Sequence, residues 1–468
     1  MTVVLAIDHR VTCAAALVID AAGEVLGSSE RSVEPRHLPG GRAEQDPREL
    51  LAAVVGAGRA AVADAGVPID VVALAPQGDC VLAWDQKSGQ PLSNLIVRPD
   101  RRAEAIRANL EGNERFLDKL SRPTLSADHP AVKLAWLRRH ITPDGVAGTA
   151  DTWLLHQLTG ELVTEISIAS HSLLVDPDTL DWHPDLLELL GIADEQVPMV
   201  LPSDRIVGTT LAFGDTVLVG GVVDRRTSVL IGKGCLRPAD ATCALGSTAD
   251  LLVNAGTTRT GGGLTSSVAW RVQDETTFYV SGQVRAAAWA IRWIKQLGLM
   301  TTFADLDRIA APDAGGVLAV PAPKRSRVAG WQPEAEAHFA GMTRSTTVGH
   351  LVLAILQGVA NQIAALGSSM ATAVGRPLSR LRVDGKLTTC TTLMQALADL
   401  MQLDVEVHPS SGAAAFGAAA VGRTAMNPAL TLEQAVTPPK LHEVFTPRWS
   451  SHQADDFRSR WAKAADTA

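Results

Sequence analysis

The chain is short of the features that mark secreted, metal-bound or nucleic-acid-binding proteins. Its 468 residues include five cysteines, an odd number, and no two of them form a Cys-x-x-Cys pair. A disulfide framework or a structural zinc site is therefore not expected, and we predict a cytoplasmic protein. Aspartate and glutamate (50) outnumber lysine and arginine (42), which leaves a net charge of −8. This balance argues against nucleic acid as a partner, because phosphate binding needs a basic face.

Uninterrupted apolar runs and targeting segments are also lacking. Gly, Asp or Arg interrupts the longest apolar stretches, so neither a membrane span nor a membrane partner is expected. The N-terminus leads directly into Val3–Ile7, which is typical of a buried strand and not of a signal peptide. The length predicts two or three domains, and 46% hydrophobic with 20% charged residues is typical of a soluble globular protein.

The predicted elements are of the α/β type, and their order is repeated in two halves. In each half two strands flank a polar turn, and strands then alternate with helices. The flanking strands are Val3–Ile7 with Ala14–Ile19, and Thr242–Gly246 with Leu251–Asn254. Capping signals and helical spacing predict helices over Pro47–Ala65, Pro130–His140, Pro184–Leu190, Val348–Leu366, Thr391–Met401 and Gly412–Gly422. We therefore predict two α/β domains, residues 1–235 and 236–468, facing each other across a cleft.

The stretch from Gly220 to Asp224 presents one carboxylate where a predicted strand gives way to a helix. The strand would hold Asp224 rigidly, and Gly220 and Gly221 would leave room for a substrate, which suits a general base. The alternative is that Asp224 only caps the next helix. Arg225 and Arg226 follow, and they could clamp phosphate or pair with acidic surface residues.

The two polar turns suit the phosphates of a nucleotide, because backbone N–H groups and hydroxyls in tight turns form anion-binding concavities. The candidate residues are Asp8 and Thr12 in the first turn, and Gly246, Ser247 and Thr248 in the second. Near phosphate, Asp8 would hold a magnesium ion through water. Each segment taken alone could also be an ordinary turn.

Two further turns carry candidate binding residues. Gln77-Gly78-Asp79 offers an amide and a carboxylate to a hydroxylated substrate, or is simply a tight turn. Asp384-Gly385-Lys386 follows a strand and begins a helix, where it could contact a nucleotide base or only cap that helix. We interpret His129 and Lys133 as structural.

These segments occur in an order that resembles the FGGY family of carbohydrate kinases along nearly the whole chain. Asp224 falls on the family's catalytic Asp, and Gly246-Ser247-Thr248 on its second phosphate turn, usually Gly-Thr-Gly. Other similar segments are Leu5–Asp8, Trp84-Asp85, Asp100-Arg101-Arg102, Asp151–Leu154, Gly341–Arg344, Leu381–Gly385 and Gly417-Ala418-Ala419. The ordered set is specific, although no single segment is.

The resemblance implies an α/β fold with two ribonuclease-H-like domains, as in actin-like ATPases, flanking an interdomain cleft. It implies ATP and Mg2+ as cofactors and phosphorylation of a small polyol or ketose (glycerol, tetritol or pentulose class), with Asp224 as general base. Substrate contacts would come from Gln77, Gly78, Asp79, Asp224 and Arg225. Nucleotide contacts would come from Asp8, Thr12, Gly246, Ser247, Thr248, Gly385 and Lys386, with Asp8 as the metal ligand. A homodimer is expected from the resemblance alone.

Departures from the family pattern concentrate at the nucleotide site. Arg10 and Val11 stand where the family's first turn, Asp-x-Gly-Thr-Thr/Ser, has a glycine and a hydroxyl, and Lys386 replaces a glycine. Arg225 stands where the family commonly has Gln or His. Two hypotheses remain: an ATP-dependent polyol or ketose kinase, and a catalytically impaired homologue that binds a sugar or a partner.

Overall fold

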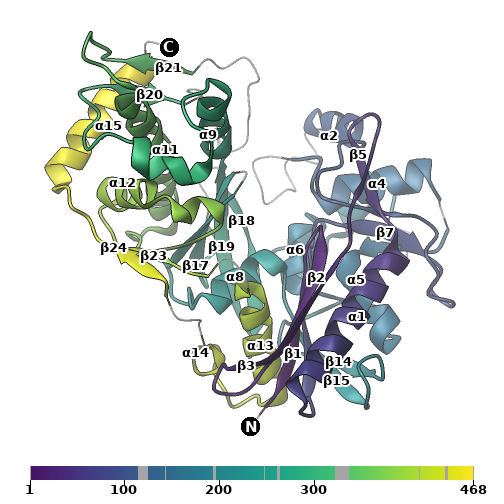
Figure 1. The fold of residues 1–468 in the computed structure, drawn as a ribbon. Helices are drawn as coiled ribbons and strands as arrows, with labels where there is room; N and C mark the ends of the chain where they lie inside the picture. The colour runs from purple at the N-terminus through teal and green to yellow at the C-terminus, as the bar shows by residue number, and fades with distance from the viewer. Residues whose placement is uncertain are drawn as a thin grey trace.

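Two large mixed β-sheets, one from each half of the chain, organise the fold (Figure 1). The computed structural model describes residues 2–113, 125–142, 144–192, 197–246, 248–260, 264–321, 337–409, 412–437 and 441–466. The first sheet has the order β14-β15-β6-β1-β2-β3. Its strands are β1 (Val4–His9), β2 (Cys13–Ile19), β3 (Val25–Ser32), β6 (Val71–Ala75), β14 (Ile206–Thr210) and β15 (Val217–Val222).

The second sheet repeats the pattern of the first. Its order is β18-β19-β17-β16-β22-β23-β24. The strands are β16 (Ala241–Leu245), β17 (Ala249–Gly256), β18 (Thr265–Val272), β19 (Glu275–Val284), β22 (Leu381–Asp384), β23 (Val405–Val407) and β24 (Glu443–Phe445). In each sheet an antiparallel hairpin, β1–β2 or β16–β17, is followed by two strands parallel to its first member. This repeat confirms the predicted pair of ribonuclease-H-like domains.

Smaller sheets and the remaining helices surround these two sheets. A five-stranded sheet has the order β4 (Arg36–Leu38), β5 (Arg42–Gln45), β8 (Leu95–Ile96), β7 (Val81–Trp84), β9 (Val146–Thr149). The strand pairs are β10 (Val163–Glu165) with β13 (Met199–Leu201), β11 (Val175–Asp176) with β12 (Asp181–Trp182), and β20 (Leu318–Val320) with β21 (His338–Ala340). Helices of the first half are α1 (Pro47–Ala65), α2 (Glu104–Glu111), α4 (Pro130–His140), α5 (Ala150–Thr159), α6 (Ile166–His171), α7 (Pro184–Leu190) and α8 (Arg225–Gly232). Those of the second half are α9 (Ala286–Gln296), α10 (Leu306–Ile309), α11 (Val348–Val374), α12 (Thr391–Met401), α13 (Ala413–Met426), α14 (Leu432–Ala435) and α15 (Ser451–Asp466).

Each large sheet is covered in part by a helix from the other half: α13 packs on the first sheet and α8 on the second. Alternate residues of a strand face opposite sides of a sheet. Along β1, Leu5 and Ile7 pack in the cluster that contains residues of α1, whereas Val4 and Ala6 pack in the cluster that contains the alanines of α13. Conversely, apolar residues of α8 pack in a cluster with residues of β17, β18 and β19 of the second sheet.

Helices α8 and α13 cross at close range between the two halves (Figure 1). Glycine makes the approach possible: a Cβ added at Gly232 would lie 1.8 Å from the Ala413 carbonyl oxygen, and one added at Gly417 would lie 1.9 Å from the Ser228 carbonyl oxygen. The hydroxyl of Ser228 also donates to the carbonyl oxygen of Ala414 at 2.6 Å. Helix α8, which begins directly after Asp224, is therefore held in place by the backbone of α13, a helix of the second half.

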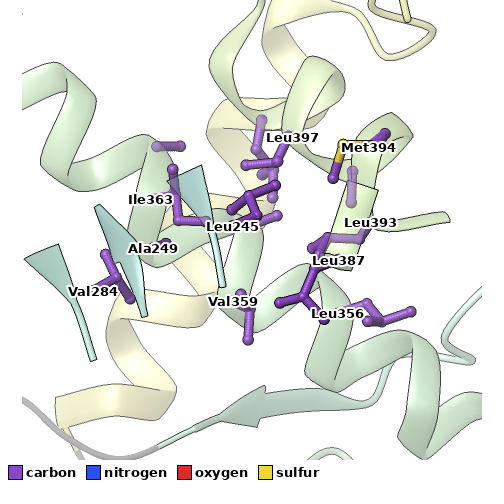
Figure 2. Packing of buried hydrophobic residues seen from close by; sticks show 14 of the residues in the cluster. Leu245, Ala249, Val284, Leu356, Val359, Ile363, Leu387, Leu393, Met394 and Leu397 are labelled. Carbon is purple, nitrogen blue, oxygen red and sulfur yellow. The ribbon is translucent and has the colours of Figure 1, made fainter. Parts of the chain in front are cut away.

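The core of the second half is built around α11, a 27-residue helix. Figure 2 shows its Leu356, Val359 and Ile363 packed with residues of α12 and of the second sheet. By length and composition α11 could span a membrane, so the expectation that no segment is long and apolar enough was wrong. However, 72% of its most apolar window is buried inside the protein, as in the core helix of a soluble protein.

Candidate active site

Three adjacent parallel strands of the first sheet end at the predicted site. Asp8 lies near the end of β1, Gln77-Gly78-Asp79 follow β6, and Asp224 follows β15, with β6 paired in parallel to both β1 and β15. Side chains that follow the carboxyl ends of neighbouring parallel strands meet at one edge of the sheet, the usual position of ligand sites in α/β proteins. The topology thus brings together segments separated by more than 200 residues in the chain.

Asp224 is the N-cap of α8, as the alternative interpretation of this residue required, and it is 2% exposed. Its Oδ1 accepts hydrogen bonds from the backbone N of Arg226 at 2.9 Å and from the Nε of Arg226 at 3.1 Å. Its Oδ2 accepts only a longer bond, 3.4 Å, from Nη2 of the same arginine. A Cβ at Gly78 would lie 2.4 Å from this Oδ2. Oδ2 therefore makes the weaker contacts with described residues, and glycine at residue 78 lets the backbone lie close to it.

Asp79 is a second buried carboxylate, and Arg226 connects it to Asp224. Its Oδ1 contacts Nε2 of His171 and lies 3.8 Å from Nη2 of Arg226. Its Oδ2 accepts from Nε2 of Gln77 at 3.1 Å and lies 3.8 Å from Nε of Arg98. Burial alone would raise the pKa of Asp79, but the charges of Arg226 and His171 outweigh it and hold that pKa well below its usual range. Asp79 is ionised, and it can accept hydrogen bonds from a hydroxylated ligand.

Buried supports hold these two carboxylates in place. Lys133 is fully buried and donates to the carbonyl oxygens of Asp79 at 2.7 Å and Val97 at 3.1 Å, in keeping with its structural interpretation. The backbone N of Asp224 donates to the hydroxyl of Ser167 at 2.9 Å, and that hydroxyl in turn contacts Glu165. The positions of Asp79 and Asp224 are therefore set by hydrogen bonds from α4 and from the start of α6.

Asp8 lies between two arginines. Its side chain is 1% exposed; Oδ2 accepts from Nε of Arg10 at 2.7 Å, and Oδ1 accepts from Nε of Arg225 at 2.6 Å. Arg225, predicted as a substrate residue, is thus turned toward the end of β1, and Arg226 is the arginine that joins Asp224 to Asp79. Arg225 and Arg226 pair with buried carboxylates and not with acidic surface residues. Thr12, in the turn between β1 and β2, is exposed.

His9 connects the first turn with the Gln77 segment. It is 1% exposed, and burial lowers the pKa of its ring to about 4. The neutral ring accepts from the backbone N of Gln77 through Nδ1 at 3.4 Å. The ends of β1 and β6 are therefore tied together by an uncharged contact, next to the charged pairs of Asp8.

This arrangement does not suit the magnesium ion predicted at Asp8. Both carboxylate oxygens already accept a hydrogen bond from a guanidinium group. Two guanidinium groups beside one carboxylate leave no net negative charge at Asp8 to attract a divalent cation. Within the described ranges, no group of three or more His, Cys, Asp or Glu side chains is placed to hold a metal. No step is therefore assigned to magnesium here.

The second sheet presents its predicted residues at the equivalent strand ends. Gly246 follows β16, and a Cβ added there would meet no atom within 4 Å, so a ligand could approach its backbone. Its N–H, however, donates to the carbonyl oxygen of Thr248 at 2.9 Å, and the hydroxyl of Thr248 donates to Asp250 at 2.8 Å. Ser247 lies outside the described residues.

Gly385 and Lys386 follow β22 and differ in environment. Gly385 has φ 103°, and a Cβ there would lie 2.4 Å from the carbonyl oxygen of Leu245, so glycine is required by the neighbouring strand β16. Lys386 is exposed at the start of a 3-10 helix (Lys386–Thr389). Its side chain makes no hydrogen bond or ion pair that involves a described residue.

Some residues of the site were missed by sequence reasoning. His171 and Arg98 reach Asp79 from α6 and from the segment after β8, and no local pattern marks them. Lys233, fully buried at the end of α8, contacts Asp384 at 3.2 Å and the hydroxyl of Thr242 at 2.7 Å. The sequence did contain a signal for this pair, because Lys233 directly follows the apolar segment Leu230-Ile231-Gly232, and a lysine buried in such a segment needs an acidic partner.

Comparison with known proteins agrees with the fold and with the order of the segments. Residues 3–228 match the model of the N-terminal domain of the FGGY family of carbohydrate kinases, and residues 241–426 match that of its C-terminal domain. The chain is 32% identical to the glycerol kinase of Alkalilimnicola ehrlichii, with 100% of this chain and 98% of the relative covered. It is also 32% identical to the glycerol kinase of Bordetella pertussis, with 99% and 96% covered.

Solved structures show the same fold at lower sequence identity. Plasmodium falciparum glycerol kinase with ADP superposes with a TM-score of 0.91 at 23% identity, covering 100% of this chain and 98% of that one. Xylulose kinase from Rhodospirillum rubrum gives 0.88 at 20% identity, covering 99% and 98%. Gluconate kinase from Lactobacillus acidophilus gives 0.86 at 17% identity, covering 100% and 98%. With both domain models matched and curated relatives similar over its whole length, the chain belongs to the FGGY family of carbohydrate kinases.

Proposed function

We propose that the protein transfers the terminal phosphoryl group of ATP to a hydroxyl of a small polyol or ketose, with Asp224 as the general base. The observation that supports this most directly is the grouping of Asp224, Asp79 and Asp8 at the ends of three neighbouring parallel strands. The relatives named glycerol kinase and the fold neighbours named xylulose kinase and gluconate kinase support this substrate class.

The proposed base has one oxygen suited to receive a proton. Oδ1 of Asp224 is held by two hydrogen bonds from Arg226, which orient the carboxylate, whereas Oδ2 accepts a longer bond and lies next to Gly78, which has no side chain. A substrate hydroxyl at this position donates to Oδ2 and loses its proton there as its oxygen bonds to the γ-phosphorus of ATP. The bond from that phosphorus to the β–γ bridging oxygen breaks, and ADP leaves. Asp79 and Gln77 bind the other hydroxyls of the substrate and fix which one reacts.

The test is an assay of ADP release with glycerol, erythritol, ribitol, xylulose, ribulose and gluconate, repeated with Asp224→Asn. We expect turnover with at least one of these compounds and a loss of 100-fold or more in kcat in the variant, the range of a general base. Asp215→Asn is the matched control, because Asp215 is exposed and lies just before the start of the same strand, β15. Unchanged kcat in Asp224→Asn would remove Asp224 from the mechanism.

A catalytically impaired homologue is the second candidate, and one observation favours it. The carboxylate predicted to serve the nucleotide, Asp8, is engaged by Arg10 and Arg225. A thermal-shift assay separates the two functions, because a ligand that binds the folded state raises the melting temperature. Stabilisation by a polyol, with none by ATP or ADP and no ADP release, would establish the impaired homologue.

A further inference from the structure

The pairs made by Asp8 leave cationic groups available at the site. Each arginine uses its Nε for Asp8, so the guanidinium groups extend past the carboxylate. The terminal nitrogens of Arg225 make no hydrogen bond with any residue in the described ranges. Nη1 of Arg10 lies 3.6 Å from Glu30, whose side chain is 58% exposed. The side chains of Arg10 and Arg225 are themselves 26% and 30% exposed, so a ligand can reach them.

The two arginines and the proposed base belong to the same edge of the first sheet. Arg225 follows Asp224 directly and is the first residue of α8. Arg10 comes from the turn between β1 and β2, where its backbone N donates to the carbonyl oxygen of Cys13 at 2.9 Å. An anion held by both guanidinium groups would therefore lie at the strand edge from which Asp224 is also presented.

The charges at the three strand ends leave no excess of carboxylate. The carboxylates of Asp8, Asp79 and Asp224 are ion-paired with four arginines, Arg10, Arg98, Arg225 and Arg226. Arg10 also lies 3.6 Å from Glu30, so four carboxylates face four guanidinium groups. Each of these carboxylates already has a cationic partner, whereas the exposed guanidinium groups of Arg10 and Arg225 remain accessible to an anion.

We propose that Arg10 and Arg225 bind the terminal phosphates of the nucleotide directly, and that nucleotide binding does not require a divalent cation held by Asp8. This proposal rests on the proposed kinase function. Asp8 then acts as a positioning residue: it holds both guanidinium groups in place and is not itself a metal ligand. Guanidinium groups suit this role because their planar donors match two phosphate oxygens at once.

The experiment measures the affinity of ADP and ATP by calorimetry, once with Mg2+ and once with EDTA, for the full chain and three variants. We expect the wild-type dissociation constant for ADP to change less than about threefold between the two conditions, since 1 kcal/mol corresponds to about fivefold. Arg10→Ala weakens binding at least tenfold in both. Asp8→Asn weakens binding by a similar factor with Mg2+ and with EDTA, because it loosens both guanidinium groups and removes no metal ligand. Arg36→Ala, whose arginine is 65% exposed and pairs with Glu49 at 3.1 Å, is the control.

Opposite results would overturn the proposal. Wild-type binding that disappears in EDTA, together with a loss of binding in Asp8→Asn that is seen only with Mg2+, would show that Asp8 serves a metal. Tighter binding in Arg10→Ala would show that Arg10 obstructs the nucleotide. Melting temperatures identify a variant that fails to fold, and if Asp8→Asn fails, Arg10→Ala in EDTA decides alone. Magnesium-dependent binding with normal ADP release would reject this proposal and leave the kinase function intact, whereas magnesium-independent binding without transfer to any substrate would do the reverse.

Discussion

Glu165 gives the sharpest prediction about stability, because it is a buried carboxyl group that supports the site. It is 2% exposed and caps α6; its Oε2 accepts from the backbone N of Ser167 at 2.9 Å and of Ile168 at 3.2 Å. Its Oε1 accepts from the hydroxyl of Ser203 at 2.5 Å, and that hydroxyl accepts from the backbone N of Arg271 in the second half. Burial raises the pKa of Glu165 from 4.5 to about 8, although the hydrogen bonds oppose the rise.

The sign of the effect follows from the direction of this shift. The folded protein keeps Glu165 protonated up to about pH 8, whereas the unfolded chain ionises it near pH 4.5. The contribution of neutral Glu165 to the free energy of unfolding is therefore fully present below pH 4.5 and is lost as the pH rises to about 8. At 1.36 kcal/mol for each pKa unit, the total is about 5 kcal/mol, of which about 4 kcal/mol is lost between about pH 5 and pH 8.

Glu165→Gln tests this reasoning, because glutamine keeps the shape and the acceptor oxygen but cannot ionise. Urea unfolding of the variant and the wild type, measured at several pH values from 5 to 8.5, gives the difference in free energy of unfolding. We expect the variant to gain about 4 kcal/mol relative to the wild type across this range. Glu188→Gln, at an exposed position of α7, is the control and should show no such trend. Parallel pH profiles for wild type and Glu165→Gln would refute the assignment of a neutral buried carboxyl group.

Three further substitutions test the packing and the site. Gly78→Ala should lower kcat at least tenfold while changing the melting temperature little, because its Cβ would lie 2.4 Å from Oδ2 of Asp224; normal kcat would mean that this oxygen is not the reacting atom. Gly417→Ala should lower the free energy of unfolding in urea by about 2 kcal/mol or more, because its Cβ would lie 1.9 Å from a carbonyl oxygen of α8. The control is Gly112→Ala, whose Cβ would have its nearest atom at 3.6 Å and which should change the free energy of unfolding by less than about 0.5 kcal/mol. Asp79→Asn should raise KM for the polyol at least tenfold with a smaller change in kcat, and an unchanged KM would place the substrate elsewhere.

Element positions that depend on local chemistry could be predicted from the sequence. The helices Pro47–Ala65, Pro130–His140, Pro184–Leu190 and Thr391–Met401 have the predicted bounds. Three of them begin at proline, which is favoured in the first turn of a helix, and α1 and α7 end before a glycine with positive φ. Asp224 could be placed at the end of a strand for the same reason, because strand, glycines and helix follow one another in the sequence.

Contacts between distant segments could not be predicted in this way. Arg225 and Arg226 are adjacent in the sequence, yet one pairs with Asp8 and the other with Asp224 and Asp79. Consecutive residues in the first turn of a helix point about 100° apart, so which arginine meets which carboxylate depends on where the neighbouring strands end. His171 reaches Asp79 across 92 residues, and the position of α6, which packs against β18 of the second sheet, decides this contact.

The crossing of α8 and α13 explains why the position of Asp224 depends on residues outside the site. Asp224 caps α8, and α8 contacts α13 through backbone atoms at Gly232 and Gly417, without a layer of side chains between the helices. Side chains can absorb small shifts by changing rotamer, but backbone in direct contact cannot. A displacement of α13 must therefore move α8, and with it the oxygen that faces Gly78. The small residues of α13 are accordingly as much a condition for the geometry of the site as the strands that carry the carboxylates.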